Sequence, residues 1–168
     1  MAHIYDYAII GSGLSGLALA AALSRETKNI ALIEANDLPY GSNKKVNFPS
    51  GPINNGLRFV PDSLLSEKAM GFIQDLIGQS VIKDVHDESP VTFEGGQLKS
   101  FLGFGDTPPA FYQDLQYFLS SKRIELNCEP YEWTQILFEQ FKGEFMPRSY
   151  VTKVHAEGQS ATHVTING

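Results

Sequence analysis

The fold of this chain is decided by residues 6–35, which read DYAIIGSGLSGLALAAALSRETKNIALIEA. An apolar run, Tyr7–Ile10, leads into glycines at positions 11, 13 and 16. A segment rich in alanine and leucine follows, and then a second apolar run over 29–33 that ends at Glu34. This order predicts a strand, a glycine turn, a helix, a second strand and an acid. It is the arrangement that holds the ADP half of a dinucleotide.

Each residue of this motif has a physical role. Gly11 allows a tight exit from the strand, Gly13 leaves room for backbone to approach a pyrophosphate, and Gly16 lets the helix pack closely on the sheet. The helix N-terminus offers free N–H groups and roughly half a positive charge to phosphates. Glu34 can accept hydrogen bonds from ribose hydroxyls and would repel a 2′-phosphate, which disfavours NADP. The alternative is a glycine-rich turn in an ordinary α/β domain, but the flanking strands and the acid favour the dinucleotide site.

The composition bears on several other classes of function. The chain has 168 residues, a net charge of −6 and no basic block, so nucleic-acid binding through a cationic surface is not expected. No apolar run reaches the length of a transmembrane segment. Cys128 is the only cysteine, so no internal disulfide can form and a reducing cytoplasm is expected. The four histidines lack metal-ligand spacing, so no metal site is expected. His155 and His163 are expected to face each other across a hairpin.

Beyond Glu34 the sequence predicts a long irregular segment followed by mixed elements. Residues 36–61 are rich in Asn, Pro, Gly and Ser, and after a dinucleotide motif such a segment is expected to serve the ligand. Helices are expected over 63–77, from 108 to 119 and over 131–142, and strands over 80–86, 90–100, 150–155 and 162–167. Residues 94–97 (EGGQ) are expected to form a hairpin turn within 90–100. The first of these helices has a predicted apolar face of Leu65, Ala69, Phe72, Ile73 and Leu76. No second strong strand–helix–strand unit follows, so we expect an N-terminal part of a longer protein.

The sequence resembles the N-terminal part of the FAD-dependent oxidoreductases that include amine oxidases, protoporphyrinogen oxidases and phytoene desaturases, with UDP-galactopyranose mutase as a relative. The resemblance rests on the glycine motif, on GPINNGLRFVP at 51–61 and on SYVTKVHAEGQSATHVTING at 149–168. It implies an α/β, Rossmann-like FAD/NAD(P)-binding domain over 1–61 and 145–168, with a βαβ start and a C-terminal hairpin. An inserted α+β portion of a substrate domain would occupy 62–144.

The resemblance also implies FAD as the cofactor and assigns the residues that hold it. The pyrophosphate would be bound by the backbone N–H groups of Gly11, Ser12, Gly13, Leu14, Ser15 and Gly16. Glu34 would hold the adenosine ribose, with Ala35 beside it. Ser42 and Asn43 would stand where the family has the second of two paired glycines and then Arg or Asn. Gly56, Leu57 and Arg58 would lie near the flavin ring, and the backbone of Val151 would contact adenine.

The implied activity is flavin-dependent oxidation of a small organic substrate by hydride transfer to the flavin. Neither the substrate, the catalytic residues nor the oligomeric state follows from the sequence. Three alternatives stay open: an NAD-dependent Rossmann dehydrogenase, a non-redox flavin mutase of the UDP-galactopyranose mutase type, and a non-catalytic nucleotide-binding fragment. The amide-rich segment after Glu34 weighs against the dehydrogenase, because NAD domains usually continue there into another strand–helix unit.

Overall fold

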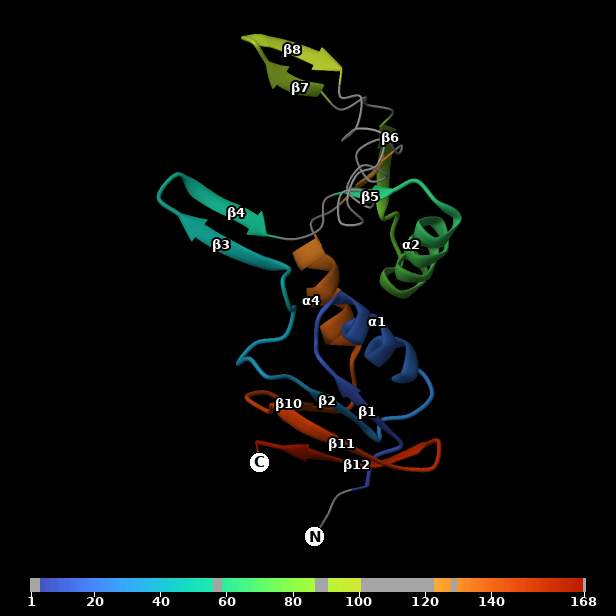
Figure 1. Ribbon diagram of the computed structural model, residues 1–168. Coiled ribbons are helices and arrows are strands. Elements are labelled where there is room, and N and C mark those ends of the chain that lie inside the picture. The colour runs from blue at the N-terminus through green and yellow to red at the C-terminus, as the bar shows by residue number, and fades with distance from the viewer. Residues whose placement is uncertain (1–3, 56–58, 87–90, 101–122, 128–129, 168) are drawn as a thin grey trace. The chain divides into compact units, whose positions relative to one another are not determined.

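The computed structural model describes residues 4–55, 59–86, 91–100, 123–127 and 130–167 (Figure 1). The chain divides into two compact units. Unit 1 comprises Met1–Leu57, Ile73–Gln79 and Cys128–Gly168, and unit 2 comprises Arg58–Phe72 and Ser80–Asn127. Residues 73–79 and 130–144, which the predicted substrate portion includes, therefore group with unit 1.

Unit 1 is built on the predicted strand–helix–strand start. β1 (Tyr7–Ile10) and β2 (Ile30–Ile33) flank α1 (Leu14–Leu23), and the two strands pair in parallel. A third parallel strand, β10 (Glu144–Met146), lies on the other side of β2, so the sheet order is β1-β2-β10. The sequence did not predict β10, because its three residues are too few to carry a periodic signal.

Helices cover one face of this sheet. On α1, Leu17, Ala18, Ala20 and Ala21 are buried, and the small side chains allow close packing against α4 (Pro130–Gln140). The predicted helix over 131–142 is confirmed by α4, and its Trp133 and Leu137 are fully buried. Every residue of β2 is buried, which is typical of a central strand in a parallel sheet.

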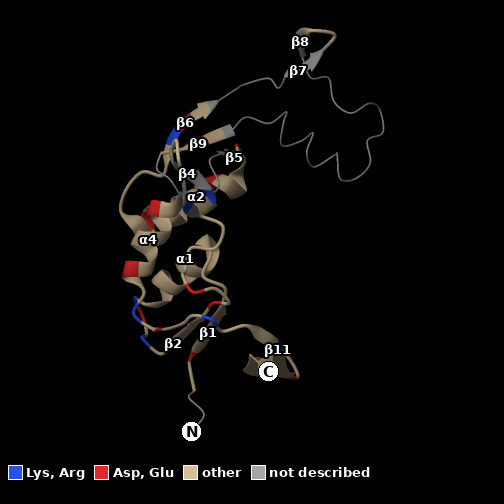
Figure 2. Ribbon diagram, turned by 90° about the vertical axis from the view of Figure 1, so that its left-hand side faces the viewer, with Lys and Arg blue, Asp and Glu red and all other residues tan. Residues whose placement is uncertain are grey.

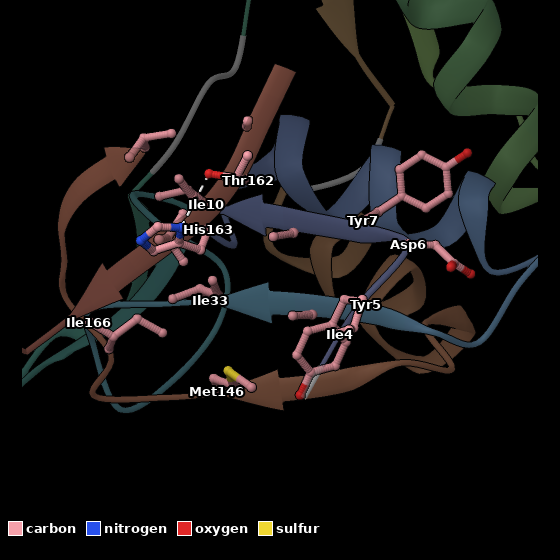
Figure 3. Close-up of a pocket in the computed structure, with 15 residues that line it drawn as sticks. Ile4, Tyr5, Asp6, Tyr7, Ile10, Ile33, Met146, Thr162, His163 and Ile166 are labelled. Carbon is pink, nitrogen blue, oxygen red and sulfur yellow. Dashed lines mark hydrogen bonds between the residues drawn. The ribbon is translucent and has the colours of Figure 1, made fainter. Parts of the chain in front are cut away.

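The other face of the sheet faces a C-terminal hairpin of β11 (Val151–Glu157) and β12 (Ser160–Ile166). The antiparallel pairing of β11 and β12 confirms the predicted hairpin. A cavity of about 930 Å³ lies between the sheet and the hairpin. Ile10 and Ile33 line it from the sheet, and His163 and Ile166 line it from β12 (Figure 3). The imidazoles of His155 and His163 face each other as predicted, with ring centroids 4.0 Å apart.

The segment after Glu34 is less irregular than its composition predicts. Residues 44–55 form a hairpin of β3 (Lys44–Phe48) and β4 (Gly51–Asn55), so the prediction of irregular structure is wrong there. Pro49 and Ser50 make a two-residue turn, and Gly51 adopts a φ of 120° that favours glycine. Pro52 lies in a two-stranded sheet, so each of these strands has one edge without a pairing strand among the described residues.

Unit 2 contains an antiparallel sheet of β5 (Phe59–Pro61), β9 (Arg123–Leu126) and β6 (Ile82–His86), in the order β5-β9-β6. A separate hairpin joins β7 (Val91–Glu94) to β8 (Gln97–Ser100). Its turn glycines, Gly95 and Gly96, both have positive φ, as the predicted tight turn requires. The predicted helix over 108–119 lies outside the described residues.

The predicted helix over 63–77 is confirmed by α2 (Leu64–Ile77), within which the boundary between the two units falls. Ser63 stabilises its start by accepting a hydrogen bond from the Ser66 N–H at 3.2 Å. The predicted apolar face is wrong in part, because Leu65, Ala69 and Phe72 are exposed. The buried positions are Met70, Ile73 and Leu76, spaced by three residues, so the buried stripe is rotated toward Met70.

Candidate functional site

The glycine turn joins β1 to α1, and each of its glycines occupies a different environment. Gly11 has a φ of 92°, and its N–H donates to the Ile33 carbonyl at 2.8 Å. A Cβ on Gly16 would lie 2.0 Å from the Gly11 carbonyl oxygen, so a side chain cannot fit there. The predicted structural roles of Gly11 and Gly16 are therefore confirmed.

Gly13 differs from its neighbours because the space beside it is open. A Cβ on Gly13 would meet no heavy atom of the described residues within 4 Å, and any residue can adopt its backbone conformation (φ −70°, ψ −178°). Neither packing nor conformation therefore requires glycine at this position. The open space is what a close backbone approach to a phosphate needs.

The first amides of α1 supply donors at this corner. Gly13 caps the helix without any side-chain hydrogen bond, and the first bond back to it comes from the Leu17 N–H at 2.9 Å. The N–H groups of Leu14, Ser15 and Gly16 thus precede the first hydrogen bond of the helix. No acidic residue lies in the first turn, so these donors and the positive end of the helix dipole can meet an anion.

Glu34 is the buried acid of the site, and both of its carboxylate oxygens accept hydrogen bonds. Oε2 accepts from the Ser12 N–H at 2.8 Å and from the Ser12 hydroxyl at 2.6 Å. Oε1 accepts from the backbone N–H of Asn36 at 2.9 Å and from its side-chain amide at 2.7 Å. Burial alone would raise the pKa of Glu34, but these hydrogen bonds outweigh it and lower the pKa to about 2. Glu34 is therefore ionised at neutral pH.

These contacts refine the predicted role of Ser12. Its backbone N–H, assigned from the resemblance to a pyrophosphate, is bonded to Glu34, so the amides that follow it offer the free donors. Its side chain is fully buried and ties the glycine turn to the tip of β2. This side-chain role was not predicted from the sequence. The sequence held a signal for it, because a serine in the glycine motif can donate a hydrogen bond to a carboxylate.

The segment after Glu34 returns to the glycine turn. The Tyr40 N–H donates to the Ser12 carbonyl at 2.9 Å, and a Cβ on Gly41 would lie 2.9 Å from the Gly13 Cα. Of the two predicted residues that follow, Ser42 is exposed and Asn43 is buried. Both therefore lie in a loop that packs on the turn.

The C-terminal segment passes the same acid. The Glu34 N–H donates to the Met146 carbonyl at 2.9 Å, and the Ser149 N–H donates to the Glu34 carbonyl at 2.8 Å. Val151, predicted to contact adenine, opens β11 two residues after Ser149 and is half-buried. Ala35, predicted beside the ribose, is exposed at the same corner. Gly56, Leu57 and Arg58, predicted near the flavin, lie outside the described residues.

The sequence and the fold are similar to those of known proteins. Residues 9–76 match the family of NAD(P)-binding Rossmann-like domains. The match agrees with the Rossmann-like fold formed by β1, α1 and β2. None of the curated proteins matches the sequence closely enough to count as a relative.

Solved structures resemble the whole chain around this Rossmann-like domain. A wild-type putrescine oxidase bound to putrescine has a TM-score of 0.60 and 14% identity, over 98% of this chain and 55% of its own. An oxidoreductase from Methanosarcina mazei has a TM-score of 0.57 and 12% identity, over 96% and 55%. A proposed protoporphyrinogen oxidase from Exiguobacterium sp. 255-15 has a TM-score of 0.61 and 10% identity, over 96% and 56%.

At these identities the likeness concerns the fold, and this chain spans just over half the length of each structure. The predicted resemblance to the oxidoreductase family is therefore confirmed as a likeness of fold. In the described part of the chain, no helix combines the length and the hydropathy that a membrane span requires. No group of three or more His, Cys, Asp or Glu residues there is arranged to hold a metal ion.

Proposed function

We propose that the chain carries the ADP-binding part of an FAD-dependent oxidoreductase of the amine oxidase kind, acting on a small organic molecule. The observation that carries the proposal is the open corner at Gly13, between the first amides of α1 and the ionised carboxylate of Glu34. The residues fit the group: the amides from Gly13 to Gly16 would bind the pyrophosphate, and Glu34 would bind the ribose. When bound, the flavin would accept a hydride from the substrate.

Recognition of the ribose involves an exchange of hydrogen bonds at Glu34. Its two oxygens already accept four bonds, from Ser12 and Asn36. A carboxylate has about four lone-pair positions, so a ribose hydroxyl would replace the Ser12 hydroxyl or the Asn36 amide. The negative charge of Glu34 would repel a 2′-phosphate, and we therefore propose that NADP is rejected.

The adenine would lie beside Val151, Ala35 would lie beside the ribose, and Ser42 and Asn43 would also contact the cofactor. Support for this placement comes from the bond between the Ser149 N–H and the Glu34 carbonyl, which brings the start of β11 to the ribose acid. Gly56 to Arg58 would approach the flavin. The inserted portion over 62–144 would contribute to the substrate site. The lone cysteine fits a reducing cytoplasm, which is the setting we propose.

An NAD-dependent dehydrogenase is the second candidate, because the matched family is described as NAD(P)-binding. Two features favour FAD. The segment after Glu34 enters the β3–β4 hairpin instead of a strand–helix unit, and the third parallel strand, β10, comes from residues 144–146. The fold is also shared with oxidases.

The test compares ligands that share or lack the ADP half. The full-length protein is expected to be yellow after desalting. Once stripped of flavin, it should bind FAD and ADP but not FMN, which contains the flavin without ADP. A protein that is colourless and prefers NADH would support the dehydrogenase. Equal binding of FMN and FAD would contradict recognition through the ADP half.

A further inference from the structure

The loop over 35–43 rests directly on the glycine turn. The Tyr40 N–H donates to the Ser12 carbonyl at 2.9 Å, and the Asn43 N–H donates to the Tyr40 carbonyl at 3.0 Å. Gly41 approaches Gly13 so closely that a Cβ on Gly41 would lie 2.9 Å from the Gly13 Cα. Any displacement of this loop would therefore change the space beside the turn.

Tyr40 sits at the centre of these contacts in an unfavourable backbone conformation. Its φ is 92°, in the region that favours glycine. A non-glycine residue keeps such a conformation when its surroundings hold it there. The hydrogen bonds of the Tyr40 N–H and carbonyl help to hold its backbone in this conformation.

The Tyr40 ring also holds this conformation, because it packs edge-on against two aromatic rings of α4. Its centroid lies 5.4 Å from that of Tyr131 and 6.1 Å from that of Phe138. Edge-to-face packing at these distances is favourable. The ring thus attaches the loop to a helix that itself packs on α1.

We propose that Tyr40 is a positioning residue of the dinucleotide site, whose ring fixes the loop over 35–43 as a second wall beside the glycine turn. The inference rests on the proposed function and extends it from the turn and Glu34 to a residue that need not touch the ligand. The aromatic ring of Tyr40, and not its hydroxyl, fixes the loop. Burial raises the pKa of the Tyr40 hydroxyl, with smaller contributions from Tyr131 and from Glu139 on the acidic α4 (Figure 2), so the hydroxyl is neutral at neutral pH.

The test measures ADP affinity by calorimetry in the full chain and its variants. Tyr40→Phe keeps the ring and should bind ADP within about twofold of wild type. Tyr40→Gly removes the ring but accepts the positive φ, so it should stay folded and lose about tenfold or more in affinity. Tyr131→Leu should weaken binding in the wild type but much less in the Tyr40→Gly background.

Phe145→Leu is the matched control, because Phe145 packs on Phe138 at 5.1 Å in the same aromatic cluster. It should leave ADP affinity unchanged. Equal affinity of Tyr40→Gly and wild type would overturn the proposal. So would a loss in Tyr40→Phe as large as the loss in Tyr40→Gly.

A second readout separates this inference from the proposed function. Hydrogen exchange without ligand should be faster at the Asn43 amide in Tyr40→Gly than in wild type, with the Leu17 amide unchanged. If wild type fails to bind ADP but this difference is seen, the proposed function falls and the anchoring role of Tyr40 stands. If exchange at Asn43 is the same in both proteins, Tyr40 does not position the loop.

Discussion

At the scale of single residues, the three glycines of the candidate site have different structural roles. Gly11 provides a positive φ, and Gly16 provides room for a backbone carbonyl. Gly13 provides open space that the fold itself does not use. Under the proposed function, the pyrophosphate would occupy this space.

Substitution by alanine should separate these roles. Gly16→Ala should destabilise the fold by about 1–3 kcal/mol, because its Cβ would collide with the Gly11 carbonyl oxygen and force a backbone shift. Gly13→Ala should leave the unfolding midpoint unchanged and weaken ADP binding by about tenfold or more. Urea unfolding and calorimetric titration of each variant check both expectations. Loss of stability in Gly13→Ala together with unchanged ADP affinity would contradict the assignment.

Ser12 and Glu34 form the second residue-scale unit, and their bond makes stability depend on pH. The folded-state pKa of Glu34, about 2, lies below its ordinary value of 4.5. The stability it contributes is therefore fully present above that ordinary value and is lost as the pH falls toward 2. A shift of this size corresponds to about 3 kcal/mol.

Ser12→Ala should lower the free energy of unfolding at neutral pH by about 1–3 kcal/mol, because a buried carboxylate loses one hydrogen bond. The pKa of Glu34 should rise, so the acid-induced loss of stability should be smaller and should be complete at a higher pH. Ser15→Ala is the matched control, since Ser15 is exposed in the same turn. Denaturant unfolding across a pH series measures all three proteins. If the free energy of unfolding depends on acidic pH in the same way in Ser12→Ala and wild type, Ser12 does not lower the pKa of Glu34.

At the scale of elements, the C-terminal hairpin carries a titratable pair. The imidazoles of His155 and His163 are stacked, with an angle of 11° between the rings. Each ring also shares a hydrogen bond with a threonine, Thr165 at 2.9 Å and Thr162 at 3.2 Å. Partial burial lowers the pKa of His155, and so do His163 and, to a smaller extent, Lys153. The neutral imidazole is thus the form that suits the folded hairpin.

A base with a lowered folded-state pKa favours folding above its ordinary pKa, and this contribution is lost as the pH falls through the folded value. The hairpin should therefore loosen as the pH drops below 6.5, the ordinary histidine value. Proton NMR titration of His155 should give a midpoint below that value. His163→Gln should raise the midpoint, and Lys153→Gln should raise it less. A midpoint that His163→Gln leaves unchanged would show that the stacked ring has no influence.

The elements also indicate how far the sequence could predict the fold. The βαβ start, α2, α4 and the two hairpins at 91–100 and 151–166 are encoded by local periodicity and turn residues, and all were predicted. β10 is held by pairing with β2, more than a hundred positions away in the sequence, and it was missed. The β3–β4 hairpin was missed because cross-strand pairing overrides a composition typical of loops.

The candidate site likewise has a part that could be predicted from the sequence and a part that could not. The glycine turn and Glu34 belong to a spaced motif and could be predicted from the sequence. The Ser12 hydroxyl on Glu34 and the Tyr40 ring on α4 join residues that are distant in sequence. Only the folded geometry brings them together.

At the scale of the whole molecule, the proposed ADP site at Gly13 and Glu34 lies within unit 1, which is built from both ends of the sequence. The backbone of Glu34 is hydrogen-bonded to Met146 and Ser149, so the C-terminal segment lies beside the proposed site. The chain covers just over half of the length of solved structures with this fold. Binding of the ADP half is thus the property most directly testable in this chain.

The most direct measurement is a titration of ADP into the ¹⁵N-labelled chain, followed by amide chemical shifts. The largest shifts should occur at Gly13, Leu14, Ser15 and Gly16, with a second group at Asn36 as Glu34 exchanges partners. Shifts confined to the cavity between the sheet and the terminal hairpin, around Ile10 and His163, would contradict the account. So would a spectrum that ADP leaves unchanged.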